Sequence, residues 1–184
     1  MKVFVWVVCL VVSAVQVRAS VTIFFEEIGG NVVATTSGSF LVPTDSPFSS
    51  GSGTSFMAIG DQFYNLNGSY NEWFASSMSS TLINQNATSA SGDTFGFGEI
   101  ISLFLPAGLT PGTSYTPNTT WTWDSMSLSD IGLGALTTTP EEVFAGPGSV
   151  DTISIAKAVP EPSTVLLLTG GLAGLAALRR KRKR

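Results

Sequence analysis

Histidine is absent from the 184-residue sequence, and cysteine occurs once, at Cys9. Cys9 lies inside an N-terminal apolar run that is typical of a cleaved signal peptide, so the mature chain would contain neither residue. A chain without them has no thiol nucleophile, no histidine general base, no Cys/His zinc site and no disulfide. The chemistry left to the mature protein is that of carboxylates, hydroxyls, amides and aromatic rings.

Basic residues are almost missing from the middle of the chain. Residues 20–158 contain twelve acidic residues and one base, Lys157, a net charge of about −11, whereas the whole chain has a net charge of −4. Such a surface repels phosphate backbones, so we expect no nucleic-acid partner. Asp93 with Glu99, or Asp124 with Asp130, could offer oxygen ligands to Ca²⁺, but neither pair has the spacing of a known calcium loop. We therefore predict no metal site and no cofactor.

Residues 1–19 have the layout of a secretory signal peptide. Lys2 supplies the positive start, residues 3–15 are nearly all apolar, and Val17 and Ala19 place compact side chains three and one residues before the expected cleavage point. The apolar run is too short to span a membrane comfortably. We predict export through the secretion translocon and cleavage by signal peptidase between Ala19 and Ser20.

Residues 20–157 show the pattern of an all-β domain. Short apolar or alternating runs are interrupted by Gly, Pro and Ser about every ten residues, which favours an antiparallel β-sandwich over a barrel. We expect strands over residues 21–28, 32–42, 55–59, 62–66, 95–105, 115–123 and 150–156, weaker strands over 70–74 and 80–83, and a short helix or turn over 124–133. The predicted core is largely aromatic and consists of Phe24, Val33, Phe40, Phe56, Phe63, Trp73, Phe97, Ile101, Phe104, Trp121, Trp123, Ile153 and Ile155.

No set of side chains in this body has the pattern of an active site. Glu26 and Glu27 are adjacent, but on a strand they point to opposite faces and are poorly placed to act together as acid and base. Trp121 and Trp123 share one side of a strand and could form a platform for stacking sugar rings, although core packing is the favoured interpretation. We expect a protein that is not an enzyme.

The C-terminal segment, residues 158–184, has three parts. Residues 158–163 contain a proline–acid–proline core, Val159-Pro160-Glu161-Pro162-Ser163, which holds the chain extended because proline lacks a backbone donor. Residues 164–178 carry no charge and predict a single transmembrane helix. The chain then ends in six bases that place this end in the cytoplasm and the body outside: Arg179, Arg180, Lys181, Arg182, Lys183 and Arg184.

This three-part order resembles the PEP-CTERM sorting signal of Gram-negative bacteria. The resemblance implies that exosortase, an integral-membrane cysteine protease or transpeptidase, recognises the Pro-Glu-Pro region and processes an anchored precursor. The family is associated with exopolysaccharide and biofilm production. Residues 21–40 and 92–133 are also similar to a common β-rich PEP-CTERM ectodomain, which mostly has no assigned function.

From this resemblance we expect a structural protein of the cell surface or extracellular matrix, without catalytic activity of its own. Its precursor would sit in the inner membrane with the body in the periplasm and the C-terminus in the cytoplasm. Its expected partners are exosortase, signal peptidase, the translocon, the inner membrane as a transient anchor and exopolysaccharide. The alternative is an extracellular carbohydrate-binding module for matrix polysaccharide.

Overall fold

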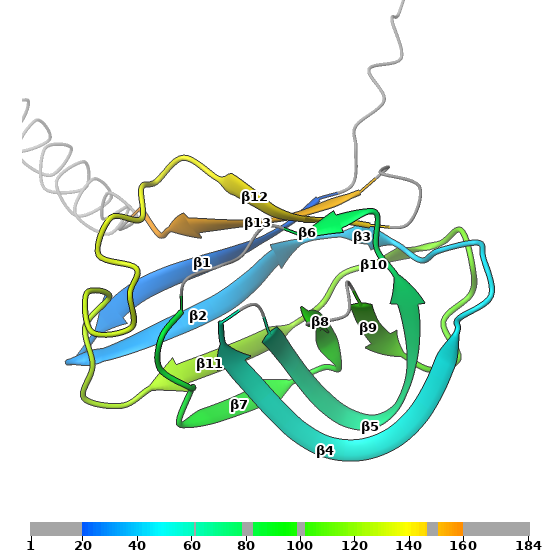
Figure 1. Ribbon diagram of the computed structural model, residues 1–184, viewed down its shortest axis with the longest axis horizontal. Coiled ribbons are helices and arrows are strands. Elements are labelled where there is room, and N and C mark those ends of the chain that lie inside the picture. The colour runs from blue at the N-terminus through cyan, green and yellow to red at the C-terminus, as the bar shows by residue number, and fades with distance from the viewer. Residues whose placement is uncertain (1–19, 61, 79–82, 99–101, 147–150, 160–184) are drawn as a thin grey trace, which may run out of the picture.

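A computed structural model of the chain describes residues 20–60, 62–78, 83–98, 102–146 and 151–159 (Figure 1). These residues form strands and turns and contain no helix, so the all-β prediction is confirmed. The strands are β1 (Ser20–Ile28), β2 (Asn31–Gly38), β3 (Phe40–Leu41), β4 (Ser49–Ile59), β5 (Gln62–Phe74), β6 (Ser77–Met78), β7 (Ser89–Gly92), β8 (Phe95–Gly98), β9 (Ser102–Pro106), β10 (Ser114–Tyr115), β11 (Thr119–Trp123), β12 (Glu141–Ala145) and β13 (Thr152–Lys157).

The larger sheet has the strand order β6-β12-β13-β1-β2-β11-β7. Its first hairpin, β1–β2, closes through Gly29 and Gly30, whose positive φ angles of 60° and 84° suit the two-residue turn that the sequence predicts. At its centre β1 and β13 run parallel, with Ser20 opposite Thr152. The expectation of a purely antiparallel body is therefore wrong at this pair. A parallel pair needs a long connection, and here most of the body separates the two strands.

A four-stranded sheet in the order β4-β5-β8-β9, here called the smaller sheet, curls back on itself, and β3 pairs with β10 in a separate two-stranded sheet. The first half of β5 pairs with β8, the second half pairs with β9, and β8 also pairs with β9. Figure 1 shows the result, with β4 and β5 drawn as two concentric arcs. Gly96 permits the close approach of β8 to β5, because a Cβ at this position would lie 2.2 Å from the carbonyl oxygen of Phe63.

Aromatic rings join the two sheets across one core. The ring of Phe63 on β5 lies 4.3 Å, between centroids, from Trp121 on β11 and 5.9 Å from Phe25 on β1. Phe97 on β8 lies 5.5 Å from Phe144 on β12. The predicted core residues that the structure buries are Phe40, Phe63, Trp73, Phe97, Trp121, Trp123, Ile153 and Ile155.

Three residues that were predicted to lie in the core are on the outer face of their strands, so the prediction is wrong for them. Phe24, Val33 and Phe104 are only partly buried, whereas their neighbours on both sides in the chain are buried: Ile23 and Phe25, Val32 and Ala34, Leu103 and Leu105. Each of these strands is apolar at consecutive positions, so the sequence alone does not tell which face is inside. Phe56 is partly buried against the core, and Ile101 lies outside the described residues.

Several predicted strands have different bounds in the structure. The predicted strand 32–42 divides at Ser39 into β2 and β3, which belong to different sheets, and 115–123 divides around Pro117 into β10 and β11. The run 95–105 forms the two strands β8 and β9. Residues 124–133 form turns, so the turn interpretation holds there rather than the helix. Of the weak strand 80–83 only Ile83 is described, as an isolated bridge partner of Gly60.

The described part of the chain has no helix with the length and hydropathy that a membrane crossing requires. The predicted signal peptide, residues 1–19, and the predicted transmembrane helix, residues 164–178, lie outside the described residues.

The alternation along β1 gives a direct test of which face is inside. Phe25→Ala should lower the free energy of unfolding by about 3–5 kcal/mol, because a fully buried ring is replaced by a cavity. Phe24→Ala, the matched control on the opposite face, should lower it by less than about half as much. Urea unfolding followed by tryptophan fluorescence measures both values. Equal losses would contradict the assignment of faces.

Candidate functional site

The body ends where the sheet ends. At the C-terminal end of β13 the Lys157 N–H donates to the carbonyl oxygen of Thr137 at 2.7 Å, and the Ala158 N–H donates to that of Phe25 at 2.8 Å. The next residue, Val159, is 61% exposed. Pro160, the first proline of the motif, therefore lies two residues beyond Ala158, which makes the last described backbone hydrogen bond to the sheet.

The two ends of the body leave the larger sheet at opposite ends. Because β1 and β13 are parallel, Ser20 lies beside Thr152, whereas Lys157 lies beside Phe25, about five residues further along the strands. Ser20, the residue expected after signal-peptide cleavage, is exposed at the start of β1, and Ala19 lies outside the described residues. Also outside them are the remaining predicted sorting and orientation residues, Pro160, Glu161, Pro162, Ser163 and the six terminal bases.

Three of the four calcium-ligand candidates accept hydrogen bonds from the protein's own backbone and hydroxyls, and the fourth, Glu99, lies outside the described residues. Asp93 Oδ2 accepts the N–H of Asn118 at 3.1 Å, and Asp124 Oδ2 accepts the hydroxyl of Thr88 at 2.9 Å. Asp130 Oδ2 accepts the N–H and the hydroxyl of Ser127, and these bonds lower the pKa of Asp130. Within the described residues no three or more acidic side chains gather as they would around a metal ion.

The adjacent pair Glu26 and Glu27 behaves as strand alternation predicts. Glu26 is partly buried on β1, and Glu27 is exposed beside it. The Oε1 atom of Glu27 accepts the backbone N–H of Leu128 at 2.7 Å, which ties the turn region after β11 to the β1–β2 hairpin. This hydrogen bond is the role that the structure shows for the Glu27 carboxylate.

The sugar platform suggested for Trp121 and Trp123 is not present. Both rings are fully buried, with Nε1 of Trp121 donating to the carbonyl oxygen of Tyr64 at 3.2 Å and Nε1 of Trp123 donating to that of Gln85 at 2.8 Å. A ring without exposed surface cannot stack on a ligand. The favoured interpretation, core packing, is confirmed, and the stacking role is wrong.

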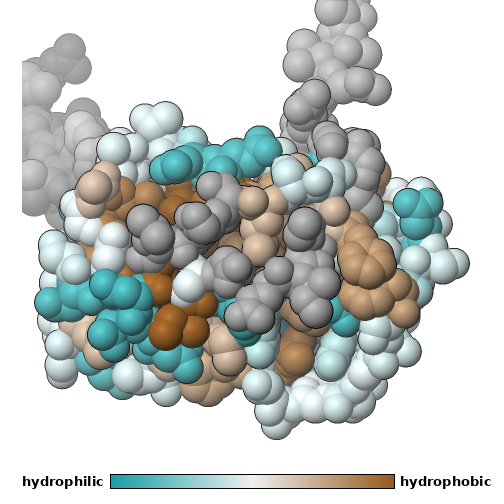
Figure 2. Space-filling view, in the orientation of Figure 1, coloured by the Kyte–Doolittle hydropathy of each residue, from teal (hydrophilic) through white to brown (hydrophobic). Residues whose placement is uncertain are grey.

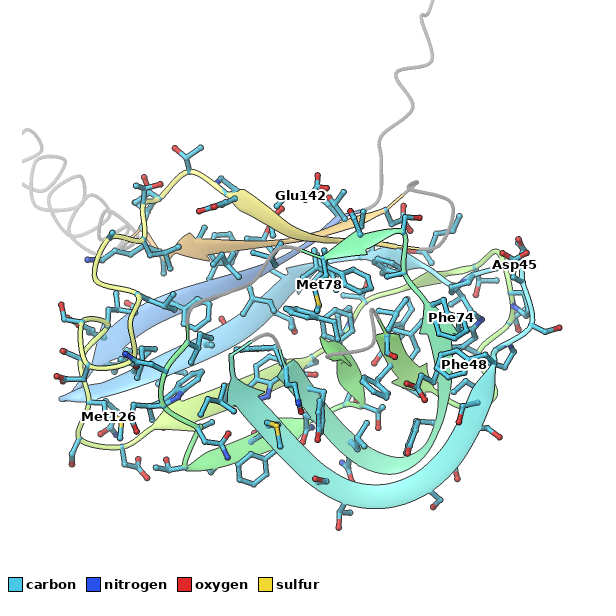
Figure 3. The ribbon with its side chains drawn as sticks, viewed as in Figure 1. Asp45, Phe48, Phe74, Met78, Met126 and Glu142 are labelled. Atoms are coloured by element: carbon cyan, nitrogen blue, oxygen red, sulfur yellow. The ribbon has the colours of Figure 1, made fainter. Side chains whose placement is uncertain are left out.

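A different aromatic pair lies on the surface. The rings of Phe48 and Phe74 are stacked, with centroids 3.9 Å apart and an interplanar angle of 12°, and they are 45% and 56% exposed. Figure 3 shows the two side chains together near Asp45, and Figure 2 shows an apolar patch at the same side of the molecule. The Nε1 atom of buried Trp73 donates to the carbonyl oxygen of Asp45 at 2.9 Å, which holds the loop that carries Phe48.

The sequence held part of the signal for this pair. Phe74 follows the predicted core residue Trp73 on a strand, so alternation places it on the opposite face. Phe48 stands in a loop after Pro47, where nothing local predicts its ring partner. The stacking is produced by the pairing of β4 with β5, which puts Ser49 opposite Glu72 and so brings the neighbouring residues together.

One buried group, Asp151, and one partly buried group, Tyr115, have raised pKa values. Burial raises the pKa of Asp151, which is 4% exposed, and the hydrogen bond that it accepts from the Leu41 N–H partly opposes this shift. Burial, and secondarily the negative charge of Asp93, raise the pKa of Tyr115, so this phenol stays protonated at all physiological pH values. Asp151 joins the segment before β13 to β3, and the Tyr115 hydroxyl on β10 donates to the carbonyl oxygen of Thr94 at 3.3 Å.

A comparison with protein families decides how the segment after β13 is understood. The family model described as the PEP-CTERM protein-sorting motif matches residues 158–182. The chain carries a PEP-CTERM sorting motif. This motif implies exosortase as the processing partner, and it implies a membrane-anchored precursor that is later exposed at the surface.

The match adds one structural fact to the motif. Its first matched residue, Ala158, is the residue whose N–H is bound to Phe25, so the PEP-CTERM motif and the sheet adjoin without a spacer. No curated protein and no solved structure matches the chain significantly.

The raised pKa of Asp151 predicts a particular pH dependence of stability. The folded state binds a proton more tightly than the unfolded state, so the free energy of unfolding should fall as the pH rises from about 4 through the raised pKa. Asp151→Asn keeps an acceptor for the Leu41 N–H and removes this titration. Urea unfolding at a series of pH values should show the parent losing stability relative to the variant over this range. Parallel pH profiles would contradict the prediction.

Proposed function

We propose that this protein is a β-sandwich surface protein, without catalytic activity of its own, that exosortase delivers to the cell surface or exopolysaccharide matrix of a Gram-negative bacterium. The observation that carries the proposal is the PEP-CTERM motif at residues 158–182, joined directly to a folded acidic body. The sequence upstream, with its predicted signal peptide, supports export of the body.

Each part of the motif has a physical role in this proposal. Pro160 and Pro162 lack backbone donors and keep the segment extended, which presents Glu161 to a protease that takes an extended chain. The uncharged residues 164–178 hold the precursor in the inner membrane. The terminal bases stay in the cytoplasm, so the body lies in the periplasm.

The structure of the body supports a short tether in the precursor. Only Val159 separates the last described sheet hydrogen bond, at Ala158, from Pro160. A processing enzyme that acts near the Pro-Glu-Pro segment would therefore work directly beside the folded sheet.

Replacing Pro160, Glu161 and Pro162 by alanine should stop processing, because the extended recognition segment is lost. The full-length precursor should then accumulate in the membrane fraction, which an immunoblot of membrane, surface and medium fractions measures. The unaltered chain in a host that lacks exosortase should give the same pattern and serves as the control. Normal processing of the triple variant in an exosortase-positive host would refute the sorting role.

We propose as a second candidate that the body binds a polysaccharide through Phe48 and Phe74. Exposed aromatic faces suit the apolar faces of sugar rings, and this stacked pair is the observation that favours the role. The net negative charge of the body would repel a polyanion, so the ligand would be a neutral or basic polysaccharide.

Affinity gel electrophoresis in neutral polysaccharides tests this candidate. Phe74→Ala and Phe48→Ala should each weaken retention about tenfold, because each removes one face of the stacked pair. Ile28→Ala, at an exposed apolar residue of the β1–β2 hairpin, is the matched control and should leave retention unchanged. Added EDTA should have no effect. Equal retention of all variants would exclude the pair as the binding surface.

A further inference from the structure

The strand β4 forms a long open edge of the smaller sheet. It pairs with β5 on one side, and in the described residues no strand pairs with its other side. It has 11 residues, whereas the edge strands of the larger sheet, β6 and β7, have 2 and 4. In Figure 1 β4 is the front arc of the curl.

The direction of the backbone groups along β4 follows from one hydrogen bond. The Ala58 N–H donates to Oδ1 of Asn86 at 3.0 Å, so the backbone of Ala58 points away from β5. Backbone direction alternates along an antiparallel strand, and the pairing of β4 with β5 continues without a shift from Ser49 to Ile59. The residues whose N–H and C=O groups also point away from β5 are therefore Ser50, Ser52, Thr54 and Phe56.

These four residues form an unprotected edge, which we call the β4 edge. Their backbone groups have no hydrogen-bond partner within the described part of the chain, and Ser50, Ser52 and Thr54 are exposed. Edge strands in native proteins are usually blunted by charges, proline, bulges or short length. Residues 49–59 contain no charged residue and no proline, and their pairing shows no bulge.

We propose that the β4 edge pairs with the β4 edge of a second copy of this chain, antiparallel and about a two-fold axis at Gly53. In this register Ser50 faces Phe56 of the partner and Ser52 faces Thr54. Each such pair exchanges two backbone hydrogen bonds, so the contact contains about eight. A Cβ built on Gly53 meets no atom within 4 Å, so a cysteine side chain can be placed at this axis.

The second copy is the occupant that this edge fits best. In the antiparallel register the uncharged, proline-free run of each copy meets the same run of the other copy. The acidic bodies repel one another over most of their surface, and the uncharged run 49–59 is where they approach with least repulsion. Each copy has one β4 edge, so the contact closes as a dimer and does not propagate.

Disulfide trapping in the full chain tests the pairing. Gly53→Cys, in a Cys9→Ser background, places two thiols at the two-fold axis, where a non-hydrogen-bonded pair has Cα atoms about 4.5 Å apart, within the disulfide range. Oxidation of the purified protein in mild detergent should give a dimer band on a non-reducing gel that reductant removes. Ser46→Cys, on an exposed loop, reports random collisions and should give at least fivefold less dimer.

Two further variants separate strand pairing from other contacts at the same place. Thr54→Pro removes an N–H that points away from β5 and leaves the β4–β5 ladder intact, so it should reduce the Gly53→Cys dimer at least tenfold. Thr54→Ala keeps this N–H and should leave the dimer unchanged, and resistance to proteolysis checks that both variants are folded.

A dimer yield no higher than that of Ser46→Cys would overturn the proposal. So would a yield that Thr54→Pro does not lower. The pairing concerns the body alone and does not depend on how the chain is sorted.

Discussion

The parallel pairing of the first and last strands of the body is the constraint on which the larger sheet depends. β13 lies between β12 and β1, so without it the sheet would divide into β6–β12 on one side and β1–β2–β11–β7 on the other. The pair also supplies buried residues on one face, among them Val21, Ile23 and Ile153, which face the core. The order of the sheet therefore requires that both ends of the body be present and in register.

The curl of the smaller sheet determines which strand edge and which aromatic residues the body exposes to solvent. One face of β5 carries Phe63 and Trp73 into the core. The other face carries Tyr64 and Tyr70, which are six positions apart in the sequence and both contact Phe104. This bending closes the β5–β8–β9 side of the sheet and leaves β4 open. The stacked phenylalanines lie where β4 begins and β5 ends, so the exposed aromatic pair and the open edge belong to the same hairpin.

The sequence predicted which segments form strands better than it predicted which strands pair and which faces are buried. Alternating, turn-rich runs were enough to predict an all-β fold. The sorting motif could also be identified, because it is a local sequence pattern that does not depend on the fold. Phe24 and Phe25 show where local reasoning ends: both are aromatic and adjacent on one strand, and only the sheet packed against β1 decides that Phe25 is inside. Trp121 and Trp123 likewise share a face whose burial depends on Phe63, which lies distant in the chain.

The pairing of β13 could not be predicted for the same reason. Its alternating residues identify a strand, but they do not name its neighbour, and a parallel partner more than 100 residues away leaves no local signal. The surface pair of Phe48 and Phe74 depends in the same way on the β4–β5 register, although strand alternation places Phe74 on the outer face once Trp73 is assigned to the core.

The place of β13 also has a mechanical consequence. A chain held through its C-terminal segment transmits load into the body at Ala158, along the axis of the strand that precedes it. Such a pull shears β13 against β12 and β1, so the hydrogen bonds on both of its sides resist together and do not open one after another. Load applied through this segment would therefore meet the pairing of β13 with both of its neighbours in the larger sheet.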